Sequence, residues 1–288
     1  MPHANHRFTV GDFECIAVCD GTSVYTNPAA MLFANAPAAE LEQALRAHAI
    51  DPGAWPEWRS DYTCLLVDTG DHRVLVDTGM GRHAPTTGEL IANLRALGVA
   101  PTDVDTVVLT HGHPDHIGGN VDAEGRCSFP EARHVMWRSE WAFWTAPLER
   151  SSGEPTLEHM HAFALRHLLP LRDRIELIEH ETDIVPGVRA VAAPGHTHGH
   201  MAVEIASGGE RLLVLADAIM HPIHVAHPAW TMRYDMLPDE TVATRRRLFR
   251  RAVDERSLLA AFHLPFPGLG HIVVDDEGWR WQPLPPAA

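Results

Sequence analysis

Short apolar segments separated by polar turns recur along the whole chain, with a period that alternates between two and about 3.6 residues. β-Branched apolar runs predict strands at 13–19, 64–67, 74–76, 107–110, 133–137, 175–178, 188–191, 201–205, 212–215, 258–262 and 272–274. Helical spacing predicts helices at 37–49, 88–97, 156–169 and 238–255, and a short one after Ser139. This succession is typical of an α/β or α+β fold with chemistry at strand ends.

Turn and cap residues mark the ends of several predicted elements. Asp20-Gly21 is expected to end the first strand in a turn, and Gly70-Asp71 to close a hairpin. Gly98 suits the C-terminal end of a helix. Ser139 and Asp239 are expected to cap the helices that follow them.

The composition favours one soluble domain spanning residues 1–288. Hydrophobic residues make up 45% of the 288 positions, enough for a sizeable core, and no repeat or low-complexity linker divides the chain. The net charge of −15 repels phosphate backbones, so nucleic acid is not an expected partner. Five arginines cluster on the last predicted helix, where we expect a solvent-exposed face: Arg245, Arg246, Arg247, Arg250 and Arg251.

The cysteines and the apolar runs bear on the cellular setting. Cys15, Cys19, Cys64 and Cys127 form no C-x-x-C pair, so reduced thiols are the default, buried where they lie in strand-like runs. The chain has no apolar run of about 18 residues and no signal-like N-terminal stretch. We therefore expect a cytoplasmic protein with no membrane partner.

The densest group of metal-ligand residues follows the predicted strand 107–110. Four candidate ligands lie within six positions: His111, His113, Asp115 and His116. A lone His-x-His is usually a solvated loop, but the strand before this cluster and Gly118-Gly119 after it favour a built site. Imidazole and carboxylate together suit zinc, iron or manganese.

Three further residues of types that bind metals also follow apolar strands: His196, Asp217 and His263. One metal takes three or four protein ligands, so seven suit two ions, with Asp217 as the natural bridging carboxylate. A water between two metals loses a proton near neutral pH and becomes a nucleophile. Zinc is the expected metal, and manganese, iron or cobalt could occupy the same ligands.

The order of these motifs resembles the metallo-β-lactamase-fold hydrolase superfamily, from about Tyr62 to His271. The motifs are His-x-His-x-Asp-His, Gly195-His-Thr-x-Gly-His200, Leu-Ala-Asp217 and a late strand-end histidine. The resemblance implies a four-layer αββα sandwich with a dinuclear metal site at one edge of its two sheets. It implies one site formed by His111, His113, His196 and Asp217, and a second formed by Asp115, His116, Asp217 and His263. It also implies that Asp77 supports the site and that His200 orients a ligand.

The segment 263–271 and the loop after Asp217 are similar to methyl parathion hydrolase-like enzymes, whose close neighbours are the acyl-homoserine lactonases. In many of those lactonases a tyrosine lies three residues after the bridging aspartate, where this chain has Met220. Another donor would have to replace that phenol, and His224 and Tyr234 are candidates.

The resemblance therefore implies a dinuclear hydrolase that cleaves a small ester, lactone or phosphotriester by attack of a metal-bridging hydroxide. β-Lactamase, a glyoxalase-II-like thioesterase and a non-hydrolytic iron redox protein on the same scaffold are the alternatives.

Catalysis is assigned to Asp115, as a proton shuttle, and to Asp217, as the bridging ligand. Three segments are expected to form the pocket wall: the loop with Trp55 and Trp58, the segment 137–144 and the loop 220–234. Packing of the two tryptophans on the core is an equal alternative. An aromatic lining favours a small hydrophobic substrate. The branch also suggests a homodimer.

Overall fold

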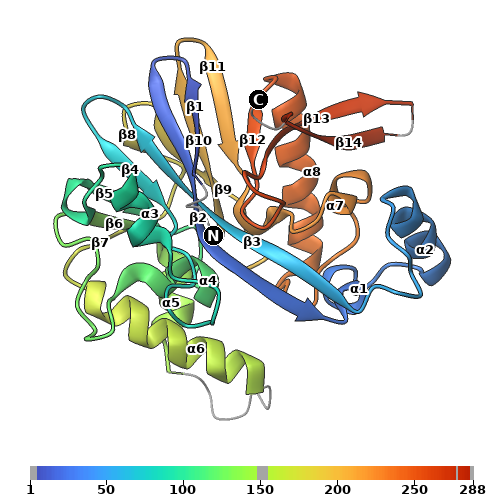
Figure 1. The fold of residues 1–288 in the computed structure, drawn as a ribbon, viewed down its shortest axis with the longest axis horizontal. Helices are drawn as coiled ribbons and strands as arrows, with labels where there is room; N and C mark the ends of the chain where they lie inside the picture. Colours follow the sequence, from blue (N-terminus) through green and yellow to red (C-terminus); the bar gives the residue numbers. More distant parts are fainter. Residues whose placement is uncertain (1–4, 148–154, 277, 286–288) are drawn as a thin grey trace.

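Two mixed β-sheets pack face to face, and helices cover both outer faces (Figure 1). The computed structural model describes residues 5–147, 155–276 and 278–285. Within them each sheet has seven strands. This arrangement confirms the expected αββα sandwich. 

The first sheet has the strand order β1-β2-β3-β4-β5-β6-β7. Its strands are β1 (Asn5–Val10), β2 (Phe13–Thr26), β3 (Glu57–Asp68), β4 (Arg73–Val76), β5 (Thr106–Val108), β6 (Arg133–Trp137) and β7 (Ile175–Ile178). The helices on its outer side are α3 (Leu90–Ala96), α4 (Pro114–Ile117), α5 (Arg138–Thr145) and α6 (Pro155–Leu168). From β4 onward the strands are parallel, so several strand ends meet at one edge.

The second sheet has the strand order β14-β13-β12-β11-β10-β9-β8. Its strands are β8 (Asp183–Val185), β9 (Val188–Ala192), β10 (Met201–Ser207), β11 (Glu210–Val214), β12 (Leu258–Ala260), β13 (Leu269–Asp275) and β14 (Gly278–Pro283). Helix α8 (Pro238–Asp254) packs on its outer face through Leu248 and Phe249, and α7 (Ile223–Ala226) lies nearby. Single 3₁₀ turns lie at Pro101–Asp103, Gly118–Asn120, Leu169–Leu171 and Ala216–Ala218.

The main core lies between the sheets. Val67 and Val108 of the first sheet belong to one buried cluster with Val203 and Val214 of the second. Their β-branched side chains suit a pleated surface that is covered on the facing side. Tight packing of these two layers fixes the relative position of the loops at their common edge.

Strand β2 does not end at Asp20-Gly21, so the expected turn there is wrong. A β-bulge between Cys19 and Gly21 lets the strand continue to Thr26. The Asp20 carboxylate instead accepts hydrogen bonds from the backbone N–H groups of Gly81, Gly88 and Leu90. A residue pair typical of turns is therefore used to bind a neighbouring loop.

Helices α5 and α8 begin one residue before Ser139 and Asp239, the residues expected to cap them. The residue before each helix is Trp137 or Leu237, and neither makes a side-chain capping bond. Ser139 and Asp239 consequently lie inside the first turn, which corrects their assignment as caps. Pro238 at the first helical position of α8 has no N–H to satisfy, so the helix starts without a polar cap.

Strands β2 and β3 form a long two-stranded arm that extends beyond the sheet to the pair Thr26 and Glu57 (Figure 1). The segment between them contains α1 (Pro28–Leu32) and α2 (Ala38–Ala47). Leu32 and Leu45 pack there in one buried cluster with Ile223 of α7. The arm thus connects the first sheet to the loop that follows β11.

The cysteines match the reduced state expected from the sequence. All four are free, and Cys15 and Cys64 are buried. Burial raises the pKa of the Cys15 thiol to about 12, so it is an inert core residue. Within the described residues, no helix is long and apolar enough to cross a membrane.

The expected solvent-exposed arginine face is wrong for Arg245, which is fully buried. Its guanidinium donates to the carbonyl oxygens of Ala218, Pro228 and Trp230. These carbonyls belong to the loop after β11, so Arg245 fixes that loop against α8.

Arg245→Ala is therefore expected to destabilise the fold by about 3 kcal/mol or more, because it removes charged hydrogen bonds and leaves buried acceptors unpaired. Equilibrium urea unfolding measures this change. Arg250→Ala, an exposed arginine on the same helix, is the matched control and should change stability by less than about 0.5 kcal/mol. Equal effects of the two substitutions would contradict a structural role for Arg245.

Candidate metal centre

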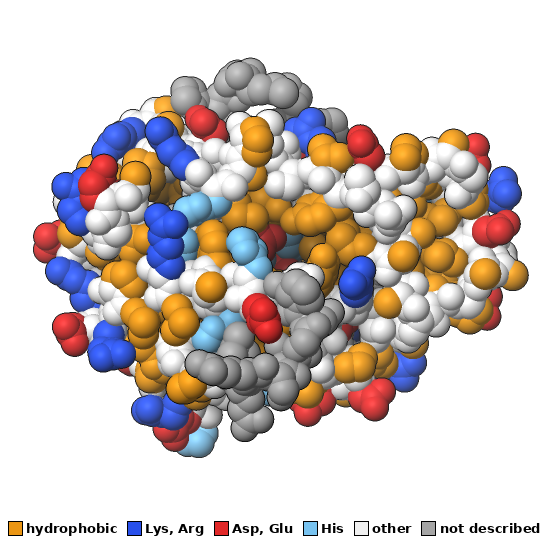
Figure 2. Space-filling model, turned by 90° about the horizontal axis from the view of Figure 1, so that it is seen from below, with side chains coloured by type: hydrophobic (Ala, Val, Ile, Leu, Met, Phe, Trp, Pro, Cys, Tyr) orange, Lys and Arg blue, Asp and Glu red, His pale blue; other side chains and the backbone are white. Residues whose placement is uncertain are grey.

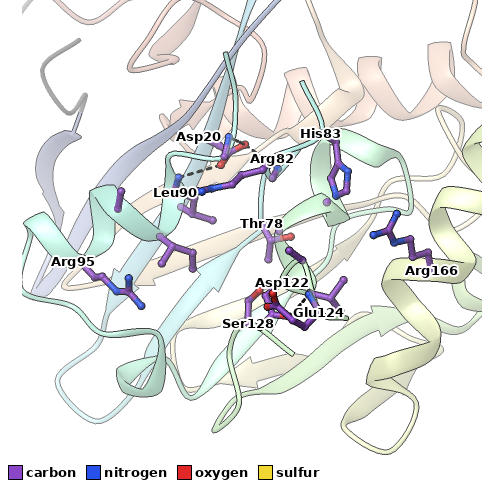
Figure 3. Close-up of a pocket in the computed structure, with 18 residues that line it drawn as sticks. Asp20, Thr78, Arg82, His83, Leu90, Arg95, Asp122, Glu124, Ser128 and Arg166 are labelled. Atoms are coloured by element: carbon purple, nitrogen blue, oxygen red, sulfur yellow. Dashed lines mark hydrogen bonds between the residues drawn. The ribbon is translucent and has the colours of Figure 1, made fainter. Parts of the chain in front are cut away.

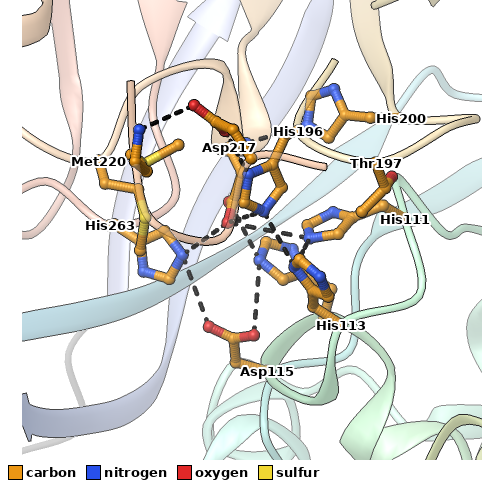
Figure 4. A network of polar contacts seen from close by, with 12 residues as sticks. His111, His113, Asp115, His196, Thr197, His200, Asp217, Met220 and His263 are labelled. Carbon is orange, nitrogen blue, oxygen red and sulfur yellow. Dashed lines mark hydrogen bonds and ion pairs between the residues drawn. The ribbon is translucent and has the colours of Figure 1, made fainter. Parts of the chain in front are cut away.

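All seven candidate ligands lie at the common edge of the two sheets (Figure 4). The first sheet supplies the loop after β5, which runs into α4, and the second supplies the ends of β9, β11 and β12. The ligand atoms form two groups: His111, His113, His196 and Asp217 in one, and Asp115, His116 and His263 in the other. The sequence places these residues up to 152 positions apart, and the fold brings them within one cluster.

The first group has three converging ring nitrogens. His113 Nδ1 lies 3.1 Å from His111 Nε2 and 2.9 Å from His196 Nε2. Asp217 Oδ2 is 3.3 Å from His196 Nε2 and 3.8 Å from His111 Nε2. Tetrahedral zinc with bonds of about 2.0–2.1 Å holds its nitrogens roughly 3.3 Å apart, so this spacing fits one ion.

The second group lies on the other side of the Asp217 carboxylate. Asp217 Oδ1 is 3.1 Å from His116 Nε2, and Asp217 Oδ2 is 3.1 Å from His263 Nε2. Asp115 Oδ2 is 3.5 Å from His263 Nε2. Asp217 therefore contacts ligand atoms of both groups, which is the position a bridging carboxylate needs.

The polar atoms of the cluster do not satisfy one another. Asp217 Oδ1 and His116 Nε2 are buried and have no hydrogen-bond partner of acceptable geometry among the described residues. His113 Nδ1 faces two other ring nitrogens, but one nitrogen can donate at most one hydrogen. Unpaired buried groups cost about 1–3 kcal/mol each, and cations at the two groups would satisfy them together. The residues present thus fit two divalent metal ions.

The charges of the cluster also suit metal ligands. Burial alone would raise the pKa of Asp217, but the neighbouring His263 and His116 hold it well below its usual value. Burial lowers the pKa of His111 and His113 well below the ordinary value for histidine. Burial also opposes the charged forms of His116 and His196, but the nearby Asp217 carboxylate raises the pKa of both, that of His196 to about 9. Imidazoles gathered around an ionised carboxylate form a ligand set typical of zinc, which binds histidine in its neutral form.

Asp77 and His200 form hydrogen bonds with residues of the cluster. Asp77 accepts hydrogen bonds from the N–H and hydroxyl of Thr110, and its Oδ2 is 2.8 Å from His116 Nδ1. His200 lies with Nδ1 2.9 Å from the Ala193 carbonyl and accepts the Asp217 N–H at Nε2. These contacts orient His116 and the backbone of Asp217.

Three supporting residues were missed by sequence reasoning. Asp235 Oδ1 lies 2.9 Å from His196 Nδ1, and Ser60 Oγ lies 2.8 Å from His263 Nδ1. Buried Glu140 accepts hydrogen bonds from Gly112 N–H and Gly199 N–H, and so joins the two histidine loops. Local spacing carries no signal for these residues, because each acts on a segment distant in the chain.

Gly118 and Gly119 allow the ligand loop to approach the end of β4 closely. A Cβ atom at Gly118 would lie 2.1 Å from the carbonyl oxygen of Met80, and one at Gly119 would lie 2.2 Å from that of Thr78. Any side chain would push the two backbones apart. Close packing of the two loops therefore requires glycine at both positions after the ligands.

A cavity of about 200 Å³ opens beside the cluster. Its lining consists of Tyr25, Met31, Met80, His113, Pro114, Asp115, Thr156, Met160, His196, Asp217, Met220 and Tyr234. A neighbouring cavity of about 310 Å³ shares part of this wall and adds Phe143. Figure 2 shows a face of the molecule hollowed near its centre, with hydrophobic, histidine and acidic side chains around the hollow.

The expected substrate contacts divide into two sets. Met220 and Tyr234 line the cavity, whereas Trp55, Trp58 and His224 are not brought to its wall. Trp58 is buried against Tyr25, and Trp55 packs against His221. His224 is fully buried, with Nε2 2.7 Å from the Leu32 carbonyl, so it is a packing residue.

Tyr25 is a cavity residue that the sequence did not reveal. It lies near the end of the β2–β3 arm, and its hydroxyl is 2.6 Å from that of Tyr62. Burial and the nearby charge of Asp115 raise the pKa of Tyr25 well above its ordinary value. Its hydroxyl therefore remains protonated and able to donate near neutral pH.

Known proteins with similar sequences include metal-dependent hydrolases. The family model for the metallo-beta-lactamase superfamily matches residues 59–258. The "Probable metallo-hydrolase" of Mycobacterium tuberculosis is 34% identical over 196 residues, which cover 54% of this chain and 56% of that protein. An N-acyl homoserine lactonase of Bacillus thuringiensis is 29% identical over 174 residues, or 53% and 62% of the two chains. The match thus spans less than two thirds of these relatives.

Solved structures match over nearly the whole chain. AidC, a dizinc quorum-quenching lactonase in complex with a product, has a TM-score of 0.88 and 28% identity, covering 98% of this chain and 97% of that one. The hydrolase AbOPH has the same TM-score with 26% identity, and the match covers 100% of both chains.

Proposed function

Because the chain belongs to the metallo-beta-lactamase superfamily, we propose that it is a dinuclear metal-dependent hydrolase that opens a small hydrophobic lactone. This membership confirms the resemblance expected from the sequence. The observation that carries the proposal is Asp217, whose carboxylate contacts ligand atoms of both groups. The similarity to a dizinc lactonase supports zinc and a lactone. Small esters and phosphotriesters, whose cleavage uses the same chemistry, are secondary substrates.

When bound, the two ions supply Lewis acidity and a deprotonated water nucleophile at neutral pH. Asp217 stays ionised and holds the two ligand groups together. Asp115 lies on the cavity wall within 3.5 Å of His263, so its carboxylate would be placed to accept the proton that the hydroxide nucleophile still carries and to pass it to the leaving oxygen. Zinc is the proposed metal, and manganese, iron or cobalt fit the same ligands.

The cavity lining supports a substrate with an apolar part. Met31, Met80, Met160 and Met220 all contribute to the wall. Methionine side chains are flexible and polarizable, so they adapt to acyl groups of different shape. Dimerisation and a cytoplasmic location, both expected from the sequence, stay predictions.

In many related lactonases a tyrosine at the position of Met220 holds the substrate carbonyl. We propose that the phenol of Tyr25 takes that role in this chain. Tyr25→Phe is expected to lower kcat/KM for a lactone by about 10- to 100-fold, because one hydrogen bond to the developing negative charge is lost. Bound metal should not change. Initial rates and metal analysis measure both effects.

Tyr234→Phe is the matched control, since Tyr234 lies on the same cavity wall. A large loss with Tyr234→Phe and none with Tyr25→Phe would reverse the assignment in favour of the residue first suggested by the sequence.

A substrate panel tests the function directly. Zinc- and manganese-loaded protein would be given an acyl-homoserine lactone, an aryl ester, a phosphotriester, a cephalosporin and a glutathione thioester, each with and without chelator. Chelator-sensitive turnover of the lactone above the others is the expected result. Faster turnover of the cephalosporin or thioester would replace the lactone with that substrate, and a reducible iron spectrum without hydrolysis would favour the redox alternative.

A further inference from the structure

A second cavity, of about 570 Å³, lies against the opposite side of the loop that follows β4 (Figure 3). Thr78, Gly118 and Gly119 line it, but none of the seven candidate ligands of the metal centre is among the described residues of its wall. Its volume falls within the range of about 300–1,000 Å³ typical of small-molecule sites. The proposed hydrolase chemistry does not use it.

The wall of this cavity is held by buried hydrogen bonds. The Asp20 carboxylate accepts the N–H groups of Gly81, Gly88 and Leu90, which fixes the loop between β4 and α3. Thr78 Oγ lies 3.0 Å from Asn120 Oδ1, which ties the same loop to the ligand loop. The cavity is therefore formed by the fold itself, before any ligand binds.

Three arginines from separate elements surround the cavity: Arg82 in the loop after β4, Arg95 in α3 and Arg166 in α6 (Figure 3). Within residues 5–147, 155–276 and 278–285, no hydrogen bond or ion pair engages their guanidinium groups. These three arginines are therefore available to a ligand, in a chain with 38 acidic residues against 23 basic ones.

The acidic residues of the same wall all have partners within the protein. Arg126 forms ion pairs with both Asp122 and Glu124. Asp20 is buried and hydrogen bonded to backbone N–H groups. With Arg126 counted, four arginines face three carboxylates, which leaves the wall with one net positive charge, and Arg82, Arg95 and Arg166 are the ones without a partner among the described residues.

The apolar part of the lining comes from Leu90, Ile91, Ala92, Val121 and Ala123, and Thr78, His83 and Ser128 add uncharged polar groups. We propose that this cavity is a second binding site, for a small organic anion with a phosphate or carboxylate head group and an apolar body. A guanidinium group matches phosphate and carboxylate geometry, so the arginine nearest the head group binds it and the others add favourable charge around the cavity (Figure 3). The apolar residues cover the hydrocarbon part.

Isothermal titration of the zinc-loaded protein tests the site with four probes: hexyl phosphate, hexanoate, inorganic phosphate and hexylamine. Hexyl phosphate or hexanoate is expected to bind with saturation, at least about tenfold more tightly than inorganic phosphate, because burial of the hexyl chain contributes. The stronger of the two identifies the head group. Hexylamine should not bind, because its charge matches that of the arginines.

The double variant Arg95→Ala/Arg166→Ala should weaken binding of the tighter probe by at least about tenfold, since it removes two charged hydrogen-bond donors. Arg250→Ala, which removes an exposed arginine outside the cavity, should leave the affinity unchanged. Ala92→Phe fills the apolar part and should also weaken binding.

The same anions can bind at the metal centre, and substrate kinetics separate the two sites. Binding that survives Arg95→Ala/Arg166→Ala and competes with the lactone substrate would place the anion at the metals and overturn the proposal. Absence of saturable binding by every anionic probe would overturn it as well. Loss of binding in the variants, with lactone KM unchanged, is the expected result.

Discussion

Asp217→Asn is expected to lower turnover on the order of 1,000-fold or more, which corresponds to about 4 kcal/mol of transition-state stabilisation. The Asp217 carboxylate is the group that contacts both sets of ligand atoms, at 3.3 Å from His196 Nε2 in the first set and 3.1 Å from His116 Nε2 in the second. An amide has nearly the same shape but carries no negative charge, so it would hold two cations far more weakly than the carboxylate. Bound zinc per chain and initial rates on a lactone measure the effect.

Asp183→Asn is a control that makes the same chemical change on the surface, where Asp183 pairs with Arg189. It should leave metal content and turnover unchanged. An Asp217→Asn protein that keeps both ions and most of its activity would show that Asp217 is not shared between two metals.

His263→Ala is expected to lower the metal content from two ions toward one and to cut turnover by about 100-fold or more, equivalent to about 2.7 kcal/mol. His263 Nε2 lies within 3.5 Å of Asp115 and Asp217, and its Nδ1 contacts Ser60. Its loss removes an imidazole from the second group and leaves the first group complete. Metal analysis after gel filtration gives the stoichiometry directly.

His271→Ala is the matched control, because His271 lies on the next strand and contacts the Ser257 carbonyl, away from the cluster. This variant should keep two ions. Retention of both ions by His263→Ala would remove His263 from the ligand set.

The seven candidate ligands could be predicted because their signals are local. Each lies directly after an apolar strand, and a strand end projects its next residues toward the edge of a sheet. His111 and His113 also alternate in the chain, which places them on one side. The fold brings all of them together as expected, with Asp217 in the centre.

The supporting and substrate-facing residues could not be predicted, because their roles depend on packing between distant segments. Glu140 reads as an ordinary helix residue, yet its buried carboxylate joins two histidine loops. Tyr25 reaches the cavity only because β2 continues through the bulge at Gly21. Trp58, which a proline-rich neighbourhood suggested as a loop residue, belongs to β3 and is buried.

Arg245 shows the same limit on a helix. Five arginines in seven positions are typical of a solvated surface, and four of them are at least partly exposed. The fifth faces inward, where three carbonyl groups of the loop after β11 accept its hydrogen bonds. A sequence does not show which carbonyls a fold leaves without donors.

The most direct test of the dinuclear account is a zinc titration of the metal-free protein, with bound metal and lactone hydrolysis followed in the same samples. Activity is expected to appear with added zinc and to reach its plateau at two ions per chain. Full activity without metal, or a plateau at one ion, would contradict it.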